Sequence, residues 1–108
     1  ERGEYIDALT GLKGAWLDWV KVGSPDGVLL ELVCFRWPHG REPRAVYDYA
    51  TIGCNHLCFQ VEDVELLWRQ LIAAGVRCHP VQTDPPGKVK NFACYDPDGT
   101  IVELVQVL

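Results

Sequence analysis

The sequence predicts an α+β fold built from two related βαβββ modules, the first of which is incomplete at its N-terminal side. The first observation is a repeat: Ser24–Val33 and Asp96–Val105 match at seven of ten positions, six identical and one a Leu–Ile pair, at an offset of 72 residues. Similarity at a fixed offset indicates a duplicated unit. The second observation is the spacing of hydrophobic residues over 53–108. It predicts five elements in the order strand, helix, strand, strand, strand.

The composition is that of a small globular domain and excludes several functional classes. The chain has 108 residues, 48% of them hydrophobic, and a net charge of −5 without a basic cluster, which argues against nucleic acid as a partner. No apolar run approaches the roughly 18 residues of a membrane span, and Glu1–Glu4 do not begin a signal peptide. Five cysteines without a zinc-knuckle spacing indicate free thiols, and therefore a cytoplasmic protein.

The first module is expected to contribute only a strand, a turn and a strand. The β-branched and aromatic residues of Ala15–Val22 favour a strand, and Pro25 and Gly27 favour the turn that follows. The expected order is a loop over 1–14, a strand over Ala15–Val22, a turn over Ser24–Gly27 and a strand over Val28–Phe35. Residues 1–37 form this partial module, and the Pro- and Gly-containing residues 38–52 are expected to be a linker.

The second module, residues 53–108, is expected to be complete. Its first strand is Gly53–Val61, and Asp63 is placed to cap a helix over Val64–Ala74 that Gly75 ends. The remaining expected elements are a strand over Val76–His79, a loop over 80–87, a strand over Lys88–Tyr95, a turn over Asp96–Gly99 and a strand over Thr100–Val107.

Two acids stand at equivalent places in the repeat. Glu31 and Glu103 each lie inside an apolar strand. A carboxylate there is costly to bury unless it is paired or binds a metal, so the two acids suggest one pseudo-symmetric site. The simpler alternative is that Glu31 and Glu103 are ordinary solvent-exposed residues on an edge strand.

His56 shares one face of the Gly53–Val61 strand with Cys54 and Cys58. An ordinary strand histidine is the simpler alternative to a metal ligand. The two cysteines lie four residues apart, about 13 Å along a strand, too far to hold one ion together. They are expected to line a pocket or to belong to the core.

These features resemble the vicinal oxygen chelate superfamily, which includes glyoxalases, bleomycin-resistance proteins and extradiol dioxygenases. The resemblance is carried by Asn55–Val64, Ala74–Val76 and Tyr95–Leu104, within a module that spans 53–108, and by the partial module at 15–35. In metal-dependent members, each module supplies a His from its first strand and a Glu from its last.

Carried over to this chain, the resemblance implies a metal site of Glu31, His56 and Glu103. The fourth ligand would stand upstream of the given sequence, 72 residues before His56. The implied ion is divalent: zinc, nickel, cobalt, manganese or iron. Glu103, or else Glu31, would be the catalytic base of a lyase or isomerase that moves a proton through a metal-bound enediolate of a small carbonyl or thioester substrate.

Two other functions remain open from the resemblance. One is an extradiol dioxygenase with ferrous iron, although its two-His, one-Glu ligand set fits the carboxylate at Glu31 less well. The other is a binding module that sequesters a small molecule without catalysis, whose members have usually lost the ligands. The resemblance also implies a homodimer.

Overall fold

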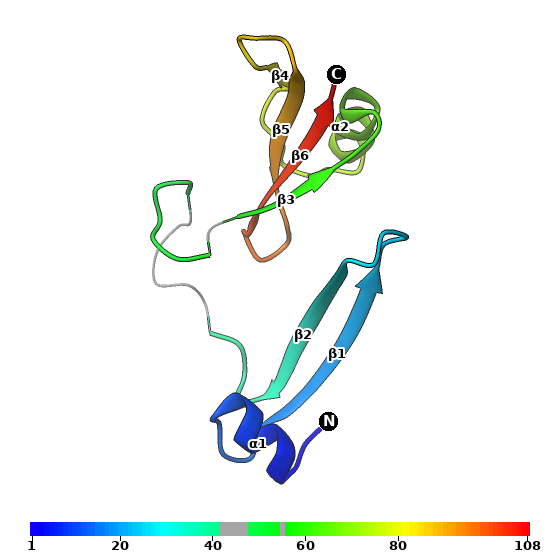
Figure 1. Cartoon of the computed structure of the whole chain (residues 1–108). Coiled ribbons are helices and arrows are strands. Elements are labelled where there is room, and N and C mark those ends of the chain that lie inside the picture. Colours follow the sequence, from blue (N-terminus) through cyan, green and yellow to red (C-terminus); the bar gives the residue numbers. More distant parts are fainter. Residues whose placement is uncertain (42–47, 55) are drawn as a thin grey trace. The chain divides into compact units, whose positions relative to one another are not determined.

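The computed structural model describes residues 1–41, 48–54 and 56–108, which fall into two compact units, Glu1–Glu42 and Pro43–Leu108 (Figure 1). The first unit holds helix α1 (Glu4–Thr10) and strands β1 (Trp16–Gly23) and β2 (Leu29–Trp37). The second holds β3 (His56–Gln60), α2 (Val64–Ala73), β4 (Gln82–Thr83), β5 (Val89–Tyr95) and β6 (Ile101–Val107). Residues 42–47 of the predicted linker and Asn55 of the predicted third strand lie outside the described residues.

Helix α1 occupies a segment for which the sequence predicted a loop, so that prediction is wrong. Gly11 ends the helix in the left-handed conformation, at φ 69°. The Asp7 carboxylate then accepts hydrogen bonds from the backbone N–H groups of Gly14 and Ala15, at 2.7 and 2.9 Å. One buried residue, Ile6, anchors this seven-residue helix, which is too short to give a clear helical periodicity.

The core of the first unit is small. Ile6, Ala15 and Leu17 are buried, and Leu12 and Phe35 pack against them. Three tryptophans of this unit do not belong to the core, because 41–55% of each is exposed: Trp16, Trp19 and Trp37.

The second unit is a four-stranded sheet with the order β3-β6-β5-β4, in which β3 and β6 are parallel and the other neighbours antiparallel. The strand predicted over Val76–His79 is wrong, because this segment makes only an isolated bridge between Cys78 and Cys94. Pro80 has no N–H to donate, so pairing stops there. It resumes at β4, inside the predicted loop.

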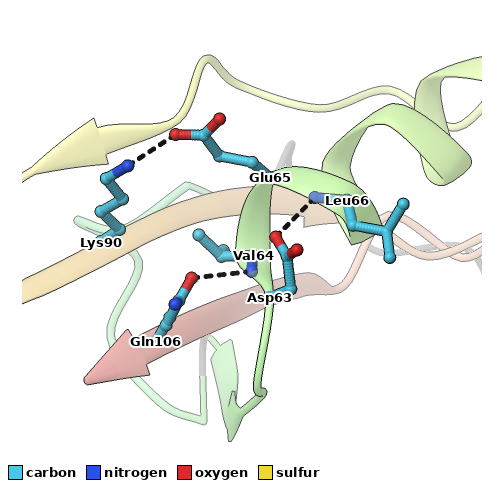
Figure 2. Close-up of polar contacts among 6 residues, drawn as sticks. All are labelled: Asp63, Val64, Glu65, Leu66, Lys90 and Gln106. Carbon is cyan, nitrogen blue, oxygen red and sulfur yellow. Dashed lines mark hydrogen bonds and ion pairs between the residues drawn. The ribbon is translucent and has the colours of Figure 1, made fainter. Parts of the chain in front are cut away.

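Helix α2 begins as predicted and is tied to the sheet at its first turn (Figure 2). The Asp63 side chain caps it by accepting from the Leu66 N–H at 2.9 Å. The Val64 N–H donates to Oε1 of Gln106 on β6 at 3.1 Å. Glu65 pairs with Lys90 on β5 at 2.7 Å, so the first turn of α2 contacts two strands (Figure 2).

Helix α2 covers one face of this sheet. Val64 of the helix packs with Phe92, Cys94 and Leu104, and all four are buried. Neighbouring residues along a strand point to opposite faces, so Ala93 and Glu103 lie on the face that α2 does not cover. Neither described helix is long and apolar enough to span a bilayer.

The two hairpins β1-β2 and β5-β6 have the same register. Val20 stands opposite Leu32 in the first unit, and Phe92 stands opposite Leu104 in the second, each 72 residues further along. The turns agree as well: Gly27 and Gly99 have φ 88° and 86°, and each donates to the first residue of its turn at 3.0 Å. The sequence repeat is therefore a structural repeat, and Glu31 and Glu103 occupy equivalent places.

Candidate functional site

The candidate site lies on the face of the second unit's sheet that α2 leaves uncovered. On β6, Glu103 stands opposite Cys58 of β3 on one side and Ala93 of β5 on the other. His56 lies two residues before Cys58 on β3 and therefore on the same face. Two of the three predicted ligands, His56 and Glu103, are thus brought to one face by neighbouring parallel strands.

The carboxylate of Glu103 is half-buried and oriented by two hydrogen bonds. Asn91, on β5, donates from Nδ2 to Oε1 at 3.0 Å. The hydroxyl of Tyr49 donates to Oε2 at 3.4 Å. Because the second contact is much the longer, Oε1 is held firmly and Oε2 is the oxygen available to a ligand or a proton.

Tyr49 contacts both predicted ligands of this unit. Its ring centroid lies 5.0 Å from that of His56, at an interplanar angle of 53°. Partial burial and the negative charge of Glu103 raise the pKa of Tyr49. The phenol therefore stays protonated at neutral pH and remains a hydrogen-bond donor to the carboxylate.

Cys58 is the closest sulfur to this carboxylate along the strand pairing. Partial burial, and then the charge of Glu103, raise the pKa of the Cys58 thiol. Metals bind the thiolate form of cysteine. Because the raised pKa keeps the Cys58 thiol protonated before any metal is bound, Cys58 is disfavoured as a metal ligand. Cys58 is exposed on the site face, which fits the expected lining role rather than the core role.

Glu31 lies in the first unit, on β2, directly opposite Lys21. Its carboxylate is 3.7 Å from the Lys21 ammonium, and both side chains are about half exposed, at 48% and 49%. It lines a groove between the hairpin and α1, together with Trp19, Lys21, Tyr5 and Leu9. The convergence of Glu31 with His56 and Glu103 stays a prediction.

The second unit carries two of the four ligand positions that the resemblance implies, His56 and Glu103. Imidazole nitrogen and carboxylate oxygen are ordinary ligands of divalent first-row metals. Among the described residues, no group of three or more His, Cys, Asp or Glu side chains is arranged to hold an ion. As metal ligands, His56 and Glu103 stay a prediction, and a site built on them would need at least one further ligand.

Two residues that contact the site were missed in the sequence. Asn91 could have been found from the hairpin register, which places it on the same face as Ala93 and Glu103. Tyr49 carried no such signal, because it lies in the predicted linker and outside any periodic pattern.

Comparison with known families gives one match over most of the chain. The sequence model of the Glyoxalase/Bleomycin resistance protein/Dioxygenase superfamily matches residues 14–104. Among curated proteins, none matches the chain.

Several solved structures share the fold at low sequence identity. A glyoxalase family protein from Bacillus cereus is 20% identical, with a TM-score of 0.90 over 100% of this chain and 73% of that one. A glyoxylase/bleomycin resistance protein/dioxygenase domain from Frankia is 23% identical, with a TM-score of 0.65 over 85% and 70%. A genomically encoded fosfomycin resistance protein from Listeria monocytogenes is 18% identical, with a TM-score of 0.58 over 97% and 83%.

Proposed function

Because the chain belongs to the Glyoxalase/Bleomycin resistance protein/Dioxygenase superfamily, we propose that it is a metal-dependent lyase or isomerase of the glyoxalase type. Its substrate would be a small carbonyl compound or thioester, from which a proton next to the carbonyl is moved. The observation that carries the proposal is the common face of His56 and Glu103, with the carboxylate already oriented by Asn91.

His56 and Glu103 would hold the ion, with Glu31 of the first module as a third ligand. Zinc, nickel, cobalt, manganese and iron all accept this combination of donors. When bound, such an ion polarises a carbonyl oxygen and acidifies the adjacent carbon.

Glu103 would be the base, with Glu31 the second candidate. The hydrogen bond from Asn91 fixes Oε1, so Oε2 is the better placed oxygen to accept a proton. Tyr49, protonated at neutral pH, would donate to Oε2 and keep the carboxylate directed to the site face. The half-burial of Glu103 limits competing hydration of the carboxylate.

Metal analysis of the purified chain separates this proposal from the two alternatives. Stoichiometric nickel, zinc, cobalt or manganese is the expected result. Iron would favour an extradiol dioxygenase, and no metal affinity would favour the binding module. The Listeria monocytogenes relative is a fosfomycin resistance protein, which adds drug-like substrates to those worth assaying.

Variants test the residue roles directly. Glu103→Gln and His56→Gln are expected to lower metal affinity by roughly 10- to 100-fold or more, since each removes a ligand. Glu62→Gln is the matched control, because it removes the same charge from an exposed residue just before α2. Equal metal affinity in the Glu103 variant and its control would refute the metal role of Glu103.

The proposal includes that the protein is a homodimer located in the cytoplasm. All five cysteines are free thiols, which fits a reducing compartment. Sedimentation of the full chain at micromolar concentration is expected to give twice the mass of one chain, and a monomer would refute the dimer.

A further inference from the structure

Cys78 and Cys94 stand directly opposite each other at the edge of the second unit's sheet. Their bridge is antiparallel, and two backbone hydrogen bonds flank it: His79 N–H to Ala93 O at 2.8 Å, and Tyr95 N–H to Arg77 O at 3.1 Å. Bonds from the flanking residues define a non-hydrogen-bonded pair, in which Cα atoms approach to about 4.5 Å. That separation lies within the range that a disulfide spans.

The two thiols also point to the same side of the sheet. Cys94 belongs to the buried core under α2, and Cys78 packs against that core. The side chains of such a non-hydrogen-bonded pair are close neighbours, and the Cys78 thiol donates to the Val76 carbonyl oxygen at 3.6 Å. Both side chains are therefore already in contact on paired backbone, so closing an S–S bond requires little backbone movement.

We propose that Cys78 and Cys94 form a redox pair that hydrogen peroxide or an organic hydroperoxide converts into an intramolecular disulfide. Cys78, the more accessible of the two, attacks one oxygen of hydrogen peroxide, which breaks the O–O bond and leaves a sulfenic acid and water; an organic hydroperoxide leaves an alcohol in place of this water. The Cys94 sulfur then attacks the sulfenic sulfur and expels hydroxide, which takes up the Cys94 proton to give a second water. One hydroperoxide is reduced and the two thiols lose two hydrogens.

The remaining cysteines are less suited to this reaction. Cys58 lies on the site face, opposite to the face that Cys94 occupies. Cys34 belongs to the first unit, and Cys54 precedes β3 on exposed chain.

The disulfide would fix a segment beside the candidate site. Tyr95 and Ala93 flank Cys94 and lie on the site face, and the Tyr95 hydroxyl is 3.0 Å from Nε2 of His79. Joining Cys78 to Cys94 closes a loop that contains β4 and pins His79 beside β5. Oxidation therefore changes the rigidity of the sheet edge next to Glu103 without touching the predicted ligands.

Burial raises the pKa of both thiols. Because the thiolate is the attacking form, oxidation is slow at neutral pH and becomes faster as the pH approaches the raised pKa. The pair thus responds to sustained oxidising conditions rather than to brief exposure.

The test uses the full chain treated with hydrogen peroxide, followed by alkylation and tryptic mapping without reduction. Trypsin cuts after Arg77, Lys88 and Lys90, which places the two cysteines in separate peptides. We expect a cross-linked Cys78–Cys94 peptide, a fall in free thiols from five to three, and a rise in Tm of roughly 10 °C that dithiothreitol reverses.

The variant Cys34→Ser/Cys54→Ser/Cys58→Ser is expected to keep the whole effect, and Cys78→Ser to lose it. If the triple variant retains both thiols under conditions that oxidise other cysteines of the natural chain, the proposal is wrong. Mapping of the natural chain decides the matter even where a variant folds poorly: a dominant cross-link or mixed oxidation elsewhere would overturn the assignment.

Discussion

The hydrogen bond from Asn91 to Glu103 makes the sharpest prediction about the candidate site. Asn91→Ala removes the 3.0 Å donor that fixes Oε1 of the half-buried carboxylate. A hydrogen bond to a charged group contributes about 1.5–3 kcal/mol, and 1.4 kcal/mol corresponds to tenfold in affinity. We therefore expect the affinity for a divalent ion to fall by roughly 10- to 100-fold, in line with other residues that orient metal ligands.

The assay is competition between the protein and a chromophoric chelator for zinc, nickel or cobalt, read by absorbance. Gln60→Ala is the matched control, because Gln60 carries the same amide on the same face, on β3. We expect it to change the affinity less than twofold. An Asn91→Ala protein that binds as the natural chain does, while Glu103→Gln does not, would show that Oε1 needs no orienting donor. The reasoning about Asn91 would then be refuted.

Three further predictions concern separate contacts. Asp63→Ala removes the N-cap of α2 and should lower the free energy of unfolding by about 1 kcal/mol in urea, with Glu62→Ala as the control. Glu103→Gln removes a negative charge that raises the pKa of Cys58, so that pKa should fall and the pH profile of Cys58 alkylation should move to lower pH; an unmoved profile contradicts the contact. Lys21→Ala removes the cation beside Glu31 and should tighten metal binding by roughly twofold to fivefold, the equivalent of a surface ion pair, if Glu31 is a ligand.

The fold was predictable from sequence wherever a regular pattern ran long enough. The repeat located both hairpins, and the spacing of apolar residues after Asp63 located α2. The errors fall on short segments decided by tertiary contacts. Helix α1 depends on Ile6 packing against Leu17, and β4 begins only after Pro80 has interrupted the pairing.

The site was predictable in part for the same reason. Strand alternation places His56 and Glu103 on one face once the parallel pairing of β3 with β6 is known. The two hydrogen-bond donors to Glu103 could not be predicted from strand alternation alone. Asn91 requires the exact register of β5 with β6, and Tyr49 reaches the carboxylate from a segment without periodicity.

Equivalent positions in the repeat do not make Glu31 and Glu103 equivalent ligands. The residue opposite Glu103 is Ala93, which adds no charge, whereas the residue opposite Glu31 is Lys21, whose ammonium is 3.7 Å away. A cation that binds Glu31 must displace or tolerate this ammonium, while one that binds Glu103 meets a carboxylate held by neutral donors. Duplication thus accounts for the two acids, and in the proposed site their neighbours would make Glu103 the stronger ligand and the better candidate base.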